Sequence, residues 1–503
     1  MKYKSTRSDA GFVSASEAIC KGIAEDGGLF VPDHLPKYSY EELCQMKNLD
    51  YIGRAERILS DFLPDFTKEE IKECLSAAYA SDKFGGSNPA PLSLEQNGSK
   101  NMYFLELWHG PTSAFKDMAL QLLPHLLTKS MKKQCPSKEA VILVATSGDT
   151  GKAALEGFKD VDGTKMIVFY PQNGVSPMQK LQMETQEGEN VEVCGVSGNF
   201  DDAQTGVKKI FTDLELGQRL KEHDMLFSSA NSINWGRLLP QIVYYFSSYC
   251  DLMNSGEIDY EGEKINIVVP TGNFGNILAA YYAKEMGLPV KKLICASNSN
   301  HVLTDFLKTG TYDRNREFYL TISPSMDILI SSNLERLLYH LTGQDNNRVR
   351  AYMKSLSETG RYTVEEDVRK HLDELFYSGY CDDEKTKSAI KMMYDTENYL
   401  CDPHTAVAVE VYHEYVETTG DEETPTILVS TASPYKFSRS VLEAISGQVS
   451  FYDEFQMVMA LSAITGTTVP EAILKLKDKP VRFKKTCSTA SMQDVVLNRL
   501  RLR

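Results

Sequence analysis

The sequence predicts an α/β protein built on parallel β-sheet. Short, strongly apolar runs recur along the chain from about residue 100, and amphipathic helical segments separate most of them. The runs are apolar almost throughout, as expected for strands that helices cover on both faces. We predict strands at residues 102–107, 141–146, 165–170, 191–196, 265–270, 293–296 and 426–431.

The first part of the chain has a different character. Residues 1–95 are mainly charged with helical periodicity, and we predict a mainly helical N-terminal domain. Ser14 and Glu17 have the spacing of a capping box, and Thr67 precedes a helix that ends near residue 78. Residues 26–32 form a turn that leads into a short extended piece. A chain of 503 residues is too long for one ordinary core, so further domains follow.

The remaining chain divides by composition. Residues 96–440 hold the predicted strands and form the main α/β region, with a smaller α/β subdomain at about 136–230. The stretch from about 345 to 400 is polar with helical periodicity, which indicates a helical insertion. Residues 441–503 are predicted to be a mostly helical tail.

Composition and charge exclude several classes of function. A hydrophobic content of 42% and a charged content of 24% are typical of globular domains. The net charge of −15, without a basic run, argues against a nucleic-acid partner. No apolar run is long enough to span a membrane and the N-terminus lacks an apolar signal core, so we expect a cytoplasmic location. The cysteines and histidines are scattered without metal-ligand spacing, and we expect no metal.

The segment 109–117, His-Gly-Pro-Thr-Ser-Ala-Phe-Lys-Asp, places Lys116 in the first turn of a helix. The positive end of the helix dipole disfavours a charged lysine, and a neutral amine is what Schiff-base chemistry needs. Thr112 or Ser113 is the expected N-cap, and Pro124 should kink the helix. Taken alone, a lysine here is more often a solvated surface charge.

Two predicted strands end in glycine-bearing loops. After the first, Thr146-Ser147-Gly148-Asp149-Thr150-Gly151 offers hydroxyls and N–H groups that suit an anion, although a tight turn with Asp149 as an N-cap is equally consistent. After the second, Thr271-Gly272-Asn273-Phe274-Gly275-Asn276 suits a phosphate. It lacks both the dinucleotide and the P-loop spacing, so a small phosphorylated cofactor fits better than a nucleotide.

Three further segments carry polar groups. Residues 430–437 bring hydroxyls to a strand end, where a hydroxyl can hydrogen-bond an unprotonated ring nitrogen. Arg237, within 231–241, can clamp a phosphate or form an interdomain salt bridge. His404 precedes an apolar helix, where capping or packing is a more common role than catalysis.

These segments, in this order and with the opening residues 3–7 and 17–32, resemble the threonine synthases, pyridoxal-phosphate enzymes of fold type II. The resemblance spans about residues 1–440 and favours the longer class with the Thr-Ser-Gly-Asp-Thr-Gly loop. It implies a fold of parallel sheets covered by helices in two subdomains, which close around a cleft. Residues 441–503 are less distinctive.

The resemblance also implies roles for single residues. Lys116 would carry pyridoxal phosphate as a Schiff base, and Thr431 would meet the ring nitrogen. The cofactor phosphate would lie in a cradle of Gly272, Asn273, Phe274 and Asn276. The substrate side would be formed by Ser147, Asp149, Thr150, Asn231 and Arg237, with Arg237 as the candidate for the substrate phosphate.

One residue departs from the wider fold type. Many fold type II enzymes have Asn where this chain has Asp149, and a carboxylate cannot donate a hydrogen bond to the phenolic oxygen of the cofactor. Asn231 or Asn234 would be alternative partners for that oxygen.

The activity implied is conversion of O-phospho-L-homoserine and water to L-threonine and phosphate. A phospho-lyase that gives 2-oxobutyrate, ammonia and phosphate is the nearest enzymatic alternative, and a catalytically silent binding protein is the alternative from another class. The expected partner is the small-molecule substrate, with the chain as a monomer or homodimer.

Overall fold

A computed structural model describes residues 1–9, 11–93, 101–146, 148–172, 175–258, 261–447, 449 and 453–502. Its largest sheet has six strands in the order β13-β10-β9-β14-β4-β3. All neighbours are parallel except β3 and β4. The strands are β3 (Leu92–Ser93), β4 (Met102–Glu106), β9 (Ile265–Pro270), β10 (Val290–Ser297), β13 (Phe376–Tyr380) and β14 (Thr426–Ser430).

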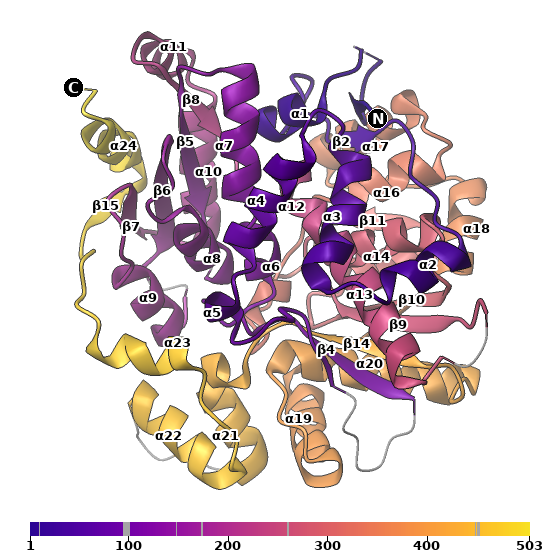
Figure 1. The fold of residues 1–503 in the computed structure, drawn as a ribbon. Coiled ribbons are helices and arrows are strands. Elements are labelled where there is room, and N and C mark those ends of the chain that lie inside the picture. Colours follow the sequence, from indigo (N-terminus) through magenta and orange to yellow (C-terminus); the bar gives the residue numbers. More distant parts are fainter. Residues whose placement is uncertain are drawn as a thin grey trace.

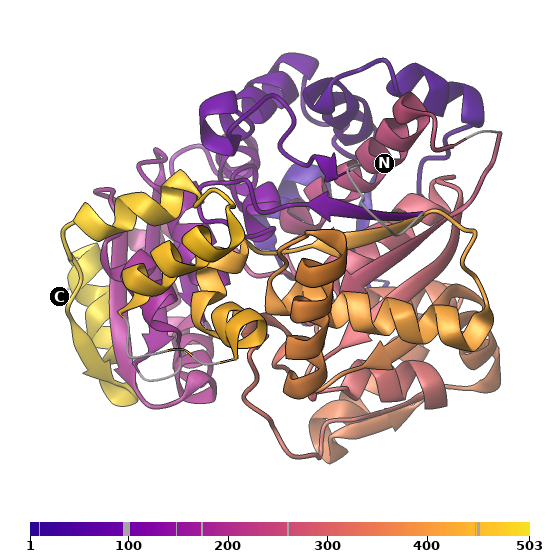
Figure 2. The same cartoon turned by 90° about the horizontal axis from the view of Figure 1, so that it is seen from below.

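A second sheet has five parallel strands in the order β15-β7-β6-β5-β8. It lies beside the large sheet, and the C-terminal segment, yellow in Figures 1 and 2, returns along its edge. The strands are β5 (Glu139–Ala145), β6 (Thr164–Pro171), β7 (Val191–Ser197), β8 (Met225–Ser228) and β15 (Thr486–Ser488).

Helices cover both faces of both sheets, so alternate residues of one strand face different cores. In β5, Ile142 and Val144 join the main core, whereas Val141 and Leu143 face a separate cluster with α10 and α24. The helices around the small sheet are α7 (Leu123–Gln134), α8 (Asp149–Phe158), α9 (Pro177–Glu184), α10 (Phe200–Phe211), α11 (Leu214–Glu222) and α24 (Met492–Leu500).

The large sheet is likewise sandwiched between helices, with α20 (Pro403–Thr419) packed along β9, β10, β13 and β14. The remaining elements of this half are α12 (Trp235–Leu238), α13 (Pro240–Ser255), α14 (Gly275–Glu285), α15 (Val302–Thr309), β11 (Thr311–Asp313), η1 (Pro324–Met326), α16 (Leu334–Leu341), α17 (Asn346–Thr359), β12 (Arg361–Thr363), α18 (Glu366–Leu375), α19 (Asp383–Glu397) and η2 (Pro434–Phe437). The C-terminal segment adds α21 (Ser438–Ser446), α22 (Glu454–Thr465), α23 (Glu471–Leu474), η3 (Lys475–Asp478) and η4 (Thr489–Ser491).

The N-terminal part is mainly helical and packs into the main core. Ser14 accepts a hydrogen bond from Glu17 N at 3.1 Å, and Thr67 forms a full capping box with Glu70. Both predicted helix starts are therefore confirmed. The elements are β1 (Tyr3–Ser5), α1 (Ala15–Lys21), β2 (Phe30–Pro32), α2 (Tyr40–Met46), α3 (Tyr51–Phe62), α4 (Lys68–Ala78) and α5 (Ser81–Phe84).

All seven predicted strands are present, and the α/β fold of parallel sheets is confirmed. The predicted helical insertion at about 345–400 contains α17, α18 and α19, but it also contains β13, which extends the large sheet beside β10. The tail likewise contains β15. The sequence pattern does not reveal either strand, because Ser378 and Gly379 interrupt the apolar run of β13 and because β15 has only three residues. No helix in the described ranges is long and apolar enough to cross a membrane.

The helix that begins at Lys116 differs from the prediction at both ends. Phe115 precedes it without a side-chain cap, and Ser113 has φ of +58°. Thr112 is not a cap either, because its N–H and hydroxyl donate to the carboxylate of Asp117 at 2.8 and 2.7 Å. Instead of a kink at Pro124, the chain forms two helices, α6 (Lys116–Leu120) and α7, with Pro124 in the first turn of α7. A proline is tolerated there because those N–H groups have no partner within the helix.

Candidate active site

Three of the four loops predicted to carry chemistry meet at one edge of the large sheet, and the fourth, after β5 of the small sheet, reaches them through Asp149. Strands β4, β14 and β9 are adjacent and parallel, so their carboxyl ends lie together. The loop after β4 is held to the loop after β14, because Phe115 N donates to the Thr431 carbonyl at 2.8 Å. This contact places Lys116 beside the segment after β14.

Lys116 is almost enclosed, with its side chain 11% exposed. Its Nζ donates to Ser325 Oγ at 3.1 Å and lies 3.9 Å from Asp149 Oδ2. Burial lowers the pKa of the Lys116 ammonium group to about 8. Asp149 opposes this shift, whereas the charges of Arg237 and Lys436 add to it. The amine therefore loses its proton far more readily than an exposed lysine.

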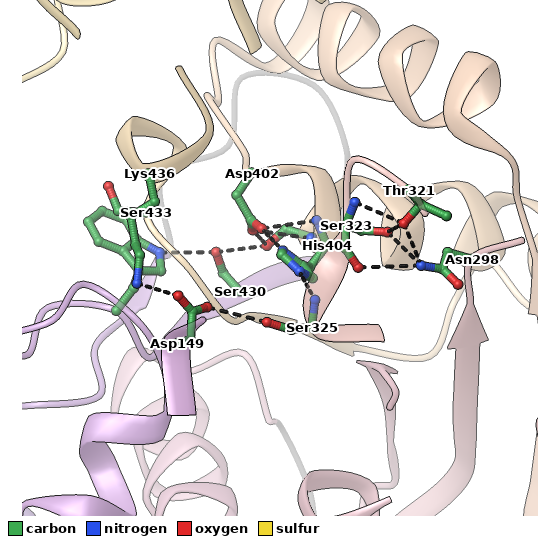
Figure 3. Close-up of polar contacts among 12 residues, drawn as sticks. Asp149, Asn298, Thr321, Ser323, Ser325, Asp402, His404, Ser430, Ser433 and Lys436 are labelled. Atoms are coloured by element: carbon green, nitrogen blue, oxygen red, sulfur yellow. Dashed lines mark hydrogen bonds and ion pairs between the residues drawn. The ribbon is translucent and has the colours of Figure 1, made fainter. Parts of the chain in front are cut away.

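Asp149 accepts hydrogen bonds from three side chains, of which those of Lys436 and Ser325 are drawn in Figure 3. Its Oδ1 accepts from Lys436 Nζ at 2.6 Å and from Gln179 Nε2 at 3.0 Å. Its Oδ2 accepts from Ser325 Oγ at 3.3 Å. Burial alone would raise the pKa of Asp149, but the two nearby ammonium groups hold this pKa well below its usual range. Asp149 is thus an anion, and its side chain does not cap α8.

A second chain of contacts holds Ser325 in place. The Ser325 N–H donates to His404 Nε2 at 3.1 Å, and His404 Nδ1 lies 2.5 Å from Asp402 Oδ2. Nε2 can accept only if it is unprotonated, so Nδ1 carries the hydrogen and donates a hydrogen bond to the Asp402 carboxylate. Asp402 is itself the N-cap of α20. His404 therefore does more than pack, because it fixes the backbone that presents the Ser325 hydroxyl.

The loop after β9 has the features of an anion site. Phe274 has φ of +64°, and α14 begins at Gly275 with its first N–H groups directed out of the helix. Asn276 is buried and its Oδ1 accepts from the hydroxyls of Tyr244, at 2.7 Å, and Tyr245. The Asn276 Nδ2 has no hydrogen-bond partner among the described residues. A buried, unpaired donor at a helix N-terminus fits a phosphate group.

Arg237 is a buried cation without a counter-ion among the described residues. Its Nη1 donates to the carbonyl of Ala230 at 3.0 Å, and no carboxylate pairs with it in the described part of the chain. The structure thus does not show the interdomain salt bridge that the sequence left open. Burial lowers the pKa of Arg237 to about 10. An uncompensated guanidinium close to Lys116 is suited to bind an anion.

The other predicted residues lie in different settings. Thr431 is buried, Thr150 is half-buried in the first turn of α8, and Asn231 and Asn273 are exposed. Asn234 is committed to the scaffold, since its amide binds the carbonyls of Ile19 and Ser229. Ser147 lies outside the described residues.

The prediction missed Ser325, Gln179 and the role of Lys436. Ser325 belongs to no motif, and Gln179 serves locally in the capping box of α9 with Ser176. Lys436 lies within a segment that the sequence singled out for its hydroxyls. Lys436 lies two residues after a Ser-Pro pair that follows a predicted strand, and this position could have marked it as a candidate site residue.

Family models match nearly the whole chain. A threonine synthase N-terminal model matches residues 2–79, a pyridoxal-phosphate dependent enzyme model matches 87–431, and a threonine synthase C-terminal model matches 405–496.

Individual proteins agree with these models. Threonine synthase-like 1 of Pongo abelii is 43% identical over 440 residues, which are 86% of this chain and 58% of that relative. The chain thus spans little more than half the length of this relative. Threonine synthase of Saccharomyces cerevisiae is 37% identical, covering 88% of this chain and 89% of the relative. The PLP-bound threonine synthase of Brucella melitensis matches with a TM-score of 0.87 and 34% identity, over 100% of this chain and 99% of that chain.

The fold and these matches define a pyridoxal-phosphate-dependent enzyme of fold type II. Within that class, the chain belongs to the threonine synthase family. The resemblance seen in the sequence is confirmed, and so is the predicted cofactor.

The phosphate loop leads to a first testable prediction. A Cβ on Gly272 would lie 2.7 Å from the carbonyl oxygen of Ser325, so Gly272→Ala must displace backbone on both sides of the site. We expect the affinity for pyridoxal phosphate to fall about tenfold or more, measured by absorbance titration of cofactor-free protein. Gly217→Ala, where a Cβ would meet nothing within 4 Å, is the control. Equal affinities for the two variants would contradict this assignment of the loop.

Proposed function

We propose that the protein converts O-phospho-L-homoserine and water to L-threonine and phosphate. The observation that carries the proposal is the pairing of a readily deprotonated lysine with an uncompensated arginine in one buried site. Burial lowers the pKa of Lys116 to about 8, and Arg237 has no carboxylate partner among the described residues. A base beside a free guanidinium suits a substrate that must lose a carbon-bound proton and carries a phosphate.

The residues around the cleft divide the binding work. Lys116 attaches the cofactor, the N-terminus of α14 with Asn276 holds the cofactor phosphate, and Thr431 faces the ring nitrogen. Arg237 binds the substrate phosphate. The ionised carboxylate of Asp149 has no hydrogen to donate, so it cannot bind the substrate carboxylate. We therefore assign that carboxylate to Ser147, Thr150 and the N–H groups at the start of α8.

When bound, pyridoxal phosphate withdraws electrons from the substrate and makes its carbon-bound protons acidic. Lys116 Nζ then removes one proton from Cα and one from Cβ, and a proton is returned to Cα at the end of the reaction. Phosphate leaves Cγ with the C–O bonding pair, and Cγ gains one proton to become the methyl group. The hydroxyl of water adds at Cβ, so one water is consumed for each phosphate released. Fixing the substrate at both anionic ends aligns these atoms with Lys116.

Product identification tests this proposal. The purified protein, loaded with pyridoxal phosphate, is incubated with O-phospho-L-homoserine, and phosphate and amino acids are measured. We expect equal amounts of L-threonine and phosphate. Phosphate accompanied by 2-oxobutyrate and ammonia would instead assign the phospho-lyase reaction. Failure to bind the cofactor would favour a silent scaffold.

The phospho-lyase is the second candidate, because one relative of this chain is named only as threonine synthase-like. The relative named threonine synthase-like 1 is 43% identical to this chain, against 37% for the yeast threonine synthase. The product assay decides between the two reactions directly.

A further inference from the structure

Two lysines approach the same carboxylate at very different distances. Lys436 Nζ lies 2.6 Å from Asp149 Oδ1, and Lys116 Nζ lies 3.9 Å from Asp149 Oδ2. The side chains of Lys436 and Asp149 are 0% and 2% exposed, so solvent does not screen their interaction. Lys436 also donates to the Thr112 carbonyl at 3.0 Å, which anchors it to the turn before Lys116. Asp149 is thus mainly the partner of Lys436.

We propose that Lys436 is a positioning residue for Lys116, which engages Asp149 so that the ε-amino group of Lys116 stays free to act as a base. Gln179 occupies the same oxygen of Asp149 as Lys436 does, which leaves only Oδ2 for Lys116. Ser325 lies between that oxygen and Lys116 and contacts both. This inference rests on the proposed function of Lys116.

The charges around Lys116 come from several elements. Asp149 lies on α8, Arg237 on α12 and Lys436 in η2, while Asp117 follows Lys116 on its own helix. Of the two carboxylates, Asp117 is bound by Thr112 and burial raises its pKa to about 6. Asp149 is therefore the group that would most stabilise a protonated Lys116, and Lys436 competes for it.

The arrangement also accounts for an aspartate at position 149. A buried carboxylate beside the catalytic lysine would by itself hold that lysine as a cation. The Lys436–Asp149 pair has no net charge and so resembles a neutral amide electrically. The two residues therefore work as one unit, and neither is expected to function normally without the other.

The test measures the proton affinity of Lys116 in the full-length protein freed of cofactor. The protein is pulse-labelled with trace acetic anhydride across pH 6–11, and mass spectrometry follows the peptide that contains Lys116. Only the neutral amine reacts, so the labelling midpoint reports its pKa. The variants are Lys436→Met, Lys436→Arg and Asp149→Asn. Lys152→Met is the matched control, because Lys152 is also buried on α8 but pairs with Glu156 at 2.9 Å.

The two key variants should move the midpoint in opposite directions. Without Lys436, the Asp149 carboxylate interacts with Lys116 alone and stabilises its protonated form. The labelling midpoint should therefore rise by about one pH unit, a tenfold change in proton affinity. Without the carboxylate of Asp149, it should fall by a similar amount. Lys436→Arg should restore the native midpoint, and Lys152→Met should leave it in place. Thermal melts show whether each variant folds.

Unchanged midpoints in folded Lys436→Met and Asp149→Asn would overturn the proposal, as would shifts in the same direction. Labelling needs no substrate, so it is independent of the product assay. Opposite shifts without threonine formation would leave this inference standing and remove the proposed function. Threonine formation without shifts in the labelling midpoint would support the proposed function and overturn this inference.

Discussion

Replacing Lys116 with alanine is expected to abolish turnover of O-phospho-L-homoserine. The variant loses both the amine that attaches the cofactor and the base that moves the substrate protons. A positioned general base alone contributes about 10² to 10⁴ in rate, so the combined loss should exceed this. The visible absorbance of covalently attached pyridoxal phosphate should disappear as well. Both are read from one preparation by product analysis and spectroscopy.

Lys129→Ala is the control, because Lys129 lies on the neighbouring helix α7 and pairs with Glu73 at the surface. It should keep both the absorbance and the activity. We also expect Lys116→Ala to fold normally, since it removes a poorly solvated amine rather than a packing group. Normal threonine formation by Lys116→Ala would refute the assignment of the base.

The second large effect is expected at Arg237. Arg237→Gln removes the uncompensated guanidinium but keeps polar bulk and hydrogen-bonding capacity. If Arg237 binds the substrate phosphate, kcat/KM should fall by about 10² to 10³, equivalent to about 3–4 kcal/mol. Inorganic phosphate should inhibit the native protein by competition and should lose this effect in the variant.

The absorbance of the attached cofactor separates the possible roles of Arg237. It should be unchanged in Arg237→Gln, because the proposal gives the cofactor phosphate to α14. Arg237→Lys keeps the charge without the fork of donors and should recover only part of the activity. Loss of cofactor binding in Arg237→Gln, with substrate affinity intact, would show that Arg237 binds the cofactor and not the substrate phosphate.

The sequence predicts the features that depend on local pattern. Continuous apolar runs identify the buried parallel strands, and β9 begins and ends at the predicted residues. Glycine-bearing strand ends identify the loops, because parallel strands bring such ends to one edge. Lys116 and the start of α14 were found in this way.

Features that depend on contacts between distant segments were not predictable. Ser325 and Lys436 contact Asp149 from 176 and 287 positions away in the sequence. No sequence periodicity or motif indicates contacts between residues so far apart. Asp149 was considered as an N-cap because local pattern cannot show that a lysine occupies its carboxylate. The strands β13 and β15 were missed for the same reason, since pairing with a neighbour defines them more than composition does.

The pairing of β4 with β14 has a consequence for how the protein is made. Tyr103 of β4 pairs with Ile427 of β14. β4 therefore cannot form this pairing until the ribosome has added more than 300 further residues. Before β14 has been synthesised, the turn before Lys116 lacks the hydrogen bond from Phe115 N to the Thr431 carbonyl that fixes it. Contacts of such sequence separation form slowly. A nascent chain should therefore be unable to capture its cofactor on the ribosome, and interrupted synthesis should yield colourless fragments rather than partly active enzyme.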